Sequence, residues 1–144
     1  MTIASILATK GNKVVTIRPE QSVRDALRVL AEHNIGALVA IDPGLRPVGI
    51  LSERDVVRAA VRDESVFDLT VSQLMTRDVI VGSAGDDLAA VGHTMIQRHI
   101  RHLPVVEGGK LIGMISIGDV VKAQRDHFQG EVDTLQTIVM EQGP

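Results

Sequence analysis

The chain has 144 residues, 44% of them hydrophobic, which is enough to bury the core of one compact domain. Its formal net charge of −3 and its two Phe, with no Trp or Tyr, argue against nucleic acid as a partner. The absence of Cys excludes disulfides and cysteine zinc sites, and because the sequence has no basic leader and no apolar run of about 18 residues, we expect a cytoplasmic protein without a membrane partner.

The first half of the chain predicts a β-α-β-β-α unit with turn residues at the expected places. In chain order the expected elements are a capped turn from Thr2, an extended segment at 14–17, an amphipathic helix from Ser22 to His33, strands at 37–41 and 48–51, and a helix from Ser52. Such a unit places both helices on one face of a small sheet, so the other face needs a partner.

The second half predicts the same elements again. They are a capped turn from Thr70, an extended segment at 79–81, a helix from about Gly85 to Arg98 with Asp86 and Asp87 in its first turn, strands at 103–106 and 111–115, and a helix from Ser116. Gly82 and Gly85 replace the β-branched and polar residues of the first half, so we expect a distorted opening of this unit.

Three stretches match in the same order, which indicates an internal duplication. Residues 2–7 align with 70–75, 33–38 with 98–103, and 46–59 with 110–123, and the offset changes only from 68 to 64. The sequence therefore predicts a first repeat at 1–65, a second at 66–126, and a C-terminal helix or tail at 127–144. We expect an α/β (α+β) fold in which the two repeats pack sheet to sheet about a pseudo-two-fold axis.

The C-terminal segment predicts one more amphipathic helix. Phe128, Val132, Leu135 and Val139 fall on one helical face. Two interpretations are open: the helix packs back on its own domain, or it forms a dimer contact.

The strand-to-helix junctions carry the candidate chemistry. Ser52 and Asp55 follow one apolar strand, and Ser116 and Asp119 follow its counterpart. A hydroxyl and free backbone N–H groups at a helix N-terminus suit an anion, and a carboxylate three residues later suits the two hydroxyls of a ribose. Ser-x-x-Asp is also an ordinary helix cap, but its recurrence after Gly-Ile-Leu and Gly-Met-Ile favours binding.

These motifs resemble the CBS-domain pair, or Bateman module, over residues 3–125. The most specific stretches are Ile100–Val106 and Gly113–Asp119. The resemblance implies a pseudo-symmetric disc with two clefts for the adenosine part of AMP, ADP, ATP, NAD(H) or S-adenosylmethionine. We expect AMP, with NAD(H) or ATP as alternatives.

The resemblance also implies a role for each site residue. Asp55 and Asp119 would bind ribose, Ser52 and Ser116 would lie near sugar and phosphate, and Ile50 and Met114 would touch adenine. Each cleft would borrow a wall from the other repeat, with Ile100, Arg101 and His102 beside Asp55, and Ile35, Gly36 and Ala37 beside Asp119. The 9–14 segment and the Arg77–Val79 segment would supply backbone groups to the base.

The two clefts should prefer different ligands. Arg54 stands beside Asp55, where the second repeat has Gly118. Because a guanidinium binds phosphate bidentately, the Arg54 side should favour a terminal phosphate such as that of AMP, whereas the Gly118 side has room for a dinucleotide. The alternative for Arg54 is a solvated helix residue in line with Arg58 and Arg62.

Catalysis has no support in the sequence. His93, His99 and His102 lack a spacing that places three metal ligands on one face, so we expect no metal site, no catalytic residue and no catalytic cofactor. The function that we expect is a nucleotide sensor that forms a homodimer and acts on a regulated partner protein. The alternative is a dimerisation or docking module whose clefts stay empty.

Overall fold

The structure is a computed structural model that describes residues 1–141. The last three residues of the predicted C-terminal segment lie outside this range. The elements are α1 (Ile3–Lys10), β1 (Thr16–Ile17), α2 (Val23–His33), β2 (Ala37–Ile41), β3 (Pro47–Ser52), α3 (Glu53–Arg62), the 3-10 helix η1 (Glu64–Asp68), α4 (Val71–Leu74), α5 (Leu88–Gln97), β4 (His102–Glu107), β5 (Lys110–Ser116) and α6 (Ile117–Glu141).

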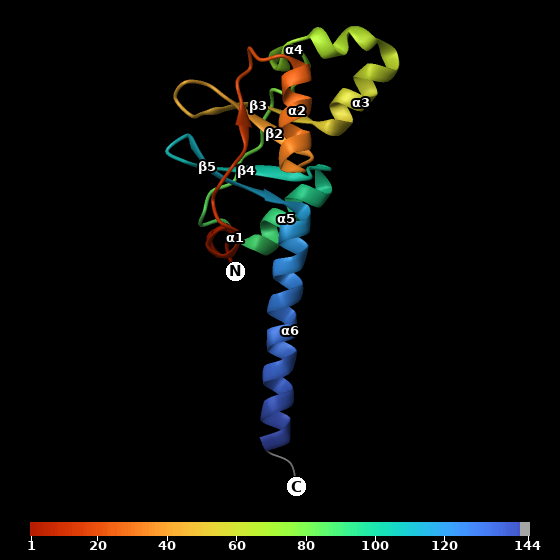
Figure 1. Ribbon diagram of the computed structural model, residues 1–144. Coiled ribbons are helices and arrows are strands. Elements are labelled where there is room, and N and C mark those ends of the chain that lie inside the picture. Colours follow the sequence, from red (N-terminus) through yellow and green to blue (C-terminus); the bar gives the residue numbers. More distant parts are fainter. Residues whose placement is uncertain (142–144) are drawn as a thin grey trace.

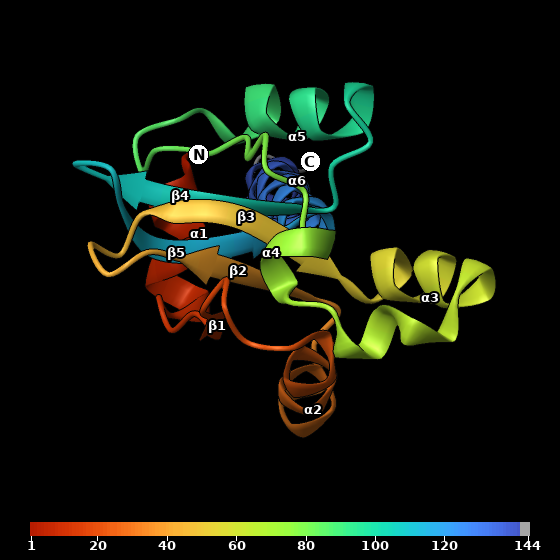
Figure 2. The same ribbon diagram turned by 90° about the horizontal axis from the view of Figure 1, so that it is seen from above.

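Two small sheets form the centre of the molecule. The first has the order β1-β2-β3, with β1 parallel to β2 and β2 antiparallel to β3, and the second is the antiparallel pair β4-β5. In Figure 2 the strands lie between α2 on one side and α5 on the other. The predicted architecture of two mixed α/β repeats is confirmed.

The second repeat opens differently from the first, as Gly82 and Gly85 suggested. Residues 79–81 form no strand among the described residues; Gly82, just after them, makes an isolated parallel bridge to Val105, and Ile80 packs against the second core. A Cβ atom at Gly82 would lie 2.8 Å from the Ile3 side chain, so the close approach requires glycine.

The predicted start of α5 at Gly85 is wrong. The helix begins at Leu88, because Asp87 is its N-cap and accepts a hydrogen bond from the Ala90 N–H. Asp86 lies before the helix and accepts from the Ser83 N–H at 2.8 Å. Both carboxylates stabilise the entry into the helix, and neither lies inside its first turn.

The opening helices are exchanged between the two cores. Ile3 and Ile6 of α1 pack in the core of the second repeat, while Val71 of α4 and the next buried residue, Met75, pack in the core of the first. Equivalent backbone hydrogen bonds fix both helices: the Ile3 N–H donates to the Asp86 carbonyl, and the Val71 N–H donates to the Gln21 carbonyl. The boundary expected near residue 65 therefore separates the two repeats along the sequence, but each hydrophobic core includes the opening helix of the other repeat.

The helix expected at 127–141 is the continuation of α6. This helix has 25 residues and projects from the body of the molecule (Figure 1). Its apolar side chains are exposed, including Phe128 (61%), Val132 (46%), Leu135 (61%) and Val139 (69%). The interpretation in which this segment packs back on its own domain is therefore wrong.

Candidate functional site

The first candidate cleft is built around the junction of β3 and α3. Ser52 is the N-cap of α3: its hydroxyl accepts from the Asp55 N–H at 3.2 Å, and Asp55 Oδ2 accepts from the Ser52 N–H at 3.1 Å. This reciprocal capping box holds the Asp55 carboxylate at the head of the helix. Among the described residues, Oδ1 of Asp55 receives no hydrogen bond, so it is available to a ligand.

A cavity of about 780 Å³ opens at this junction and has walls from both repeats. Arg54, Asp55 and Arg58 come from α3, whereas Arg101 and His102 come from the chain that enters β4. Its volume is typical of a small-molecule site.

Most of the predicted residues of this cleft line the cavity. They are Ile50, Ser52, Arg54, Asp55, Val79, Ile100, Arg101 and His102. Gly36, which we expected beside Asp119, also lines it. Ile35 packs against the first core, and Ala37 is buried in β2 opposite Ser52.

Several lining residues were missed by the sequence reasoning. They are Glu53, Arg58, Thr76, Ile80, Met95, Ile96, His99 and Ile117, whereas Asp78, which also lines the cavity, lies in the segment that was expected there. Arg58 was recoverable, because it lies one helical turn after Arg54 and shares its face. The residues of α5 were not, since nothing local in the sequence shows that the end of α5 contributes to the same cavity as α3.

A backbone pair borders the cavity where adenine was expected. The Ile50 N–H donates to the Thr76 carbonyl at 2.9 Å, and the Thr76 N–H donates back to the Ile50 carbonyl at 2.8 Å. The chain can pair here because α4 is short and turns into an extended conformation at Met75. This pair holds the segment that leads to Val79 against β3.

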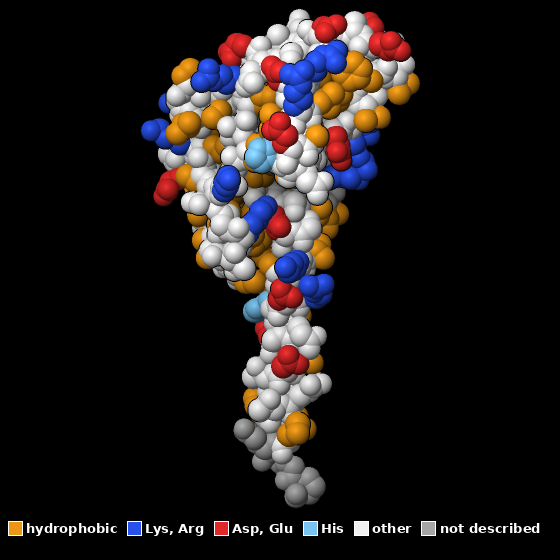
Figure 3. Space-filling model, viewed as in Figure 1, with side chains coloured by type: hydrophobic (Ala, Val, Ile, Leu, Met, Phe, Trp, Pro, Cys, Tyr) orange, Lys and Arg blue, Asp and Glu red, His pale blue; other side chains and the backbone are white. Residues whose placement is uncertain are grey.

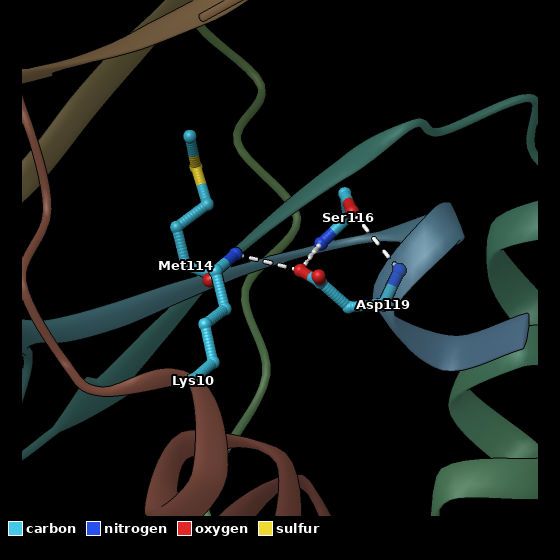
Figure 4. A network of polar contacts seen from close by, with 4 residues as sticks. All are labelled: Lys10, Met114, Ser116 and Asp119. Carbon is cyan, nitrogen blue, oxygen red and sulfur yellow. Dashed lines mark hydrogen bonds and ion pairs between the residues drawn. The ribbon is translucent and has the colours of Figure 1, made fainter. Parts of the chain in front are cut away.

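The second candidate junction has the same capping geometry. The Ser116 hydroxyl accepts from the Asp119 N–H at 3.0 Å, and Asp119 Oδ2 accepts from the Ser116 N–H at 2.8 Å. Gly118 is exposed beside Asp119, and Met114 is half-buried on β5. The four predicted residues of this junction therefore lie together, as three of them do in Figure 4.

Lys10, from the 9–14 segment that was expected to supply only backbone groups, places its side chain at this second junction. Lys10 Nζ lies 2.6 Å from Asp119 Oδ2 and donates to the Met114 carbonyl at 3.0 Å (Figure 4). The Met114 carbonyl corresponds to that of Ile50, which accepts from a backbone N–H in the first cleft. The Lys10 ammonium therefore binds the Met114 carbonyl in the second junction, where the Thr76 N–H binds the Ile50 carbonyl in the first.

Charge and burial shift two pKa values at these junctions. Burial alone would raise the pKa of Asp119, but the hydrogen bonds from Lys10 and Ser116 together outweigh it and hold the pKa below 3.8. Burial, followed by the charge of Lys10, lowers the pKa of His102 below 6.5. His102 lines the first cavity and pairs with Ser116 of the second junction across β4 and β5, so it lies between the two junctions.

Other kinds of site find little support in residues 1–141. No three His, Asp or Glu side chains gather there as a possible metal site. Across that same range, no helix combines the length and apolar character needed to cross a membrane. A second cavity of about 300 Å³ lies between α5 and the 80–82 segment, and it shares Ile80, Met95 and Ile100 with the first.

The fold and the two junctions define a tandem-repeat module with the same capped strand-to-helix junction in each repeat and an open cavity at the Asp55 junction. The sequence profile of the CBS domain matches residues 4–62 and 71–126. The chain belongs to the CBS-domain family, as the resemblance predicted.

Individual relatives agree with this assignment. The crystal structure of the CBS-domain containing protein ATU1752 from Agrobacterium tumefaciens is similar, with 37% identity, a TM-score of 0.82, and coverage of 86% of this chain and 99% of that one. A 17.7 kDa protein of Acidianus ambivalens is 36% identical over 126 residues, which are 83% of this chain and 76% of the relative. CBSX2, solved in complex with AMP, has 28% identity, a TM-score of 0.74, and coverage of 87% and 96%.

Proposed function

We propose that the protein is a regulatory module that binds an adenine nucleotide in the Asp55 cavity and carries out no reaction of its own. The observation that supports this most strongly is the Asp55 carboxylate, which a capping box holds at the edge of an open cavity of about 780 Å³. A carboxylate in this position accepts hydrogen bonds from the two hydroxyls of a ribose.

The lining of the cavity combines apolar side chains with positively charged ones. Ile50, Ile80 and Ile100 provide apolar surface for a flat base, whereas Arg54 and Arg101 provide guanidinium groups for a phosphate. AMP satisfies all three requirements with one base, one ribose and one phosphate. The AMP complex of CBSX2 supports this choice, and NAD(H) and ATP are the alternative ligands.

Calorimetric titration with AMP tests the proposal. Asp55→Asn keeps an acceptor for the Ser52 N–H but loses the charge, so the dissociation constant should rise at least about tenfold, because a hydrogen bond to a charged group contributes about 1.5–3 kcal/mol. Asp25→Asn is the matched control, since Asp25 holds the same position after the N-cap Ser22 of α2 but lies outside the cavity. Equal affinity in wild type and Asp55→Asn would refute the assignment, and a folded wild type that binds no AMP, ATP or NADH would favour the ligand-free docking module.

The exposed apolar face of α6 offers this module a contact with another chain. Phe128, Val132, Leu135 and Val139 are exposed and spaced by four, three and four residues, which is the a/d pattern of a coiled coil. Figure 3 shows hydrophobic side chains at the surface of the projecting helix. A second copy of this chain fits the seam, because two identical apolar stripes cover each other in a symmetric dimer. A nucleotide that shifts the body against this helix would alter the surface presented to a regulated partner.

A further inference from the structure

The two ribose-binding junctions differ in charge, although their capping geometry is the same. Asp119 is paired with Lys10, whereas Asp55 is paired with no cation among residues 1–141. At the offset of 68 residues that aligns the opening segments, Lys10 corresponds to Asp78, which lines the Asp55 cavity. The duplication has therefore placed opposite charges at corresponding positions.

The fold brings Lys10 to Asp119 through the length of α1. This helix has eight residues, whereas its counterpart α4 has four, and Lys10 is its last residue. Gly11 ends the helix with a φ of 91° and donates its N–H to the Leu7 carbonyl. A Cβ atom at Gly113 would lie 2.8 Å from Leu7, so this glycine lets α1 sit directly on β5.

We propose that Lys10 competes with the sugar hydroxyls of a nucleotide for Asp119, so that the Asp55 cleft fills first and the Asp119 cleft fills only when Lys10 is displaced. This inference rests on the proposed function. Asp119 Oδ2 already accepts from the Ser116 N–H and from the Lys10 ammonium at 2.6 Å, which leaves Oδ1 for one sugar hydroxyl but no lone pair of Oδ2 for the second hydroxyl.

The competition lowers the affinity of the Asp119 site for a nucleotide but does not prevent binding. The Lys10 side chain is 41% exposed and that of Asp119 is 26% exposed, so water screens the pair and the ammonium can swing out on its flexible stem. A half-exposed pair of this kind alters an equilibrium by about fivefold at most. Lys10 therefore sets the order in which the two clefts fill.

Adenosine is the probe that isolates this effect. It has the ribose but no phosphate, so the positive charge of Lys10 cannot attract it, and AMP provides the comparison. Calorimetric titrations of full-length wild type and Lys10→Met should show a tighter site that is lost in Asp55→Asn, and a weaker site whose dissociation constant for adenosine falls about fivefold in Lys10→Met. Lys110→Met, an exposed lysine on β5, is the matched control and should leave both sites unchanged.

The outcomes separate this inference from the proposed function. A folded wild type that binds none of adenosine, AMP, ATP and NADH refutes the proposed function. A wild type with a working Asp55 site, combined with a second site that Lys10→Met leaves unchanged or weakens, refutes the competition alone. In particular, unchanged adenosine affinity with weakened AMP affinity would assign Lys10 to the phosphate.

Discussion

The contact between α4 and β3 makes a quantitative prediction for Gly49→Ala. A Cβ atom at Gly49 would lie 2.6 Å from Met75 Cγ and 3.0 Å from Met75 Cε, well inside the roughly 3.5–4.0 Å of ordinary carbon contacts. Met75 is only 8% exposed and belongs to the first core, so it has little room to move away. Overpacking of this kind costs about 1–3 kcal/mol, which lowers the melting temperature by roughly 4–10 °C in a chain of this size.

Urea unfolding followed by circular dichroism measures this loss as a shift of the midpoint at constant slope. Gly85→Ala is the matched control, because its Cβ would meet no atom within 4 Å, and it should stay within about 0.5 kcal/mol of wild type. Gly49→Ala should also bind AMP more weakly than wild type, because Thr76 follows Met75 and pairs with Ile50 at the cavity. If Gly49→Ala were as stable as wild type, Met75 at the end of α4 would not be tightly packed against β3, and the prediction would be refuted.

Two further predictions concern pH and assembly. Because burial, followed by Lys10, holds the pKa of His102 below 6.5, the unfolded chain binds more protons, so the free energy of unfolding falls as the pH decreases from about 6.5 through the folded-state pKa. His102→Gln should flatten this decline in urea unfolding at pH 7.5 and 5.5, and equal slopes in both proteins would contradict the burial argument. Leu135→Glu should raise the dimer dissociation constant at least about 100-fold in analytical ultracentrifugation, since each copy loses an apolar seam residue worth about 2 kcal/mol; a wild type that stays monomeric would exclude the seam as a dimer contact.

The parts of the site that local sequence encodes could be predicted. Ser52 with Asp55 and Ser116 with Asp119 are capping boxes, whose hydrogen bonds span three residues and leave a readable pattern. The antiparallel strands around them are equally local, because turn residues join each pair. The CBS assignment followed from these two patterns and their repetition.

The parts that depend on distant packing could not be predicted. The Lys10 contact with Asp119 spans 109 residues, and it depends on α1 continuing to Lys10 where α4 stops at Leu74. The sequence also gave no sign that α6 would continue past 126 without a break, since the expected boundary rested on the end of the repeat rather than on a helix-stopping residue.

The exchange of opening helices has a consequence during synthesis. Ile3 packs with Met95 and Ile115, which leave the ribosome about a hundred residues later. At about 5–20 residues per second, α1 waits about 5–20 s for its partners, with its apolar side chains uncovered meanwhile. The packing of α1 is therefore completed only after the second repeat has been synthesised.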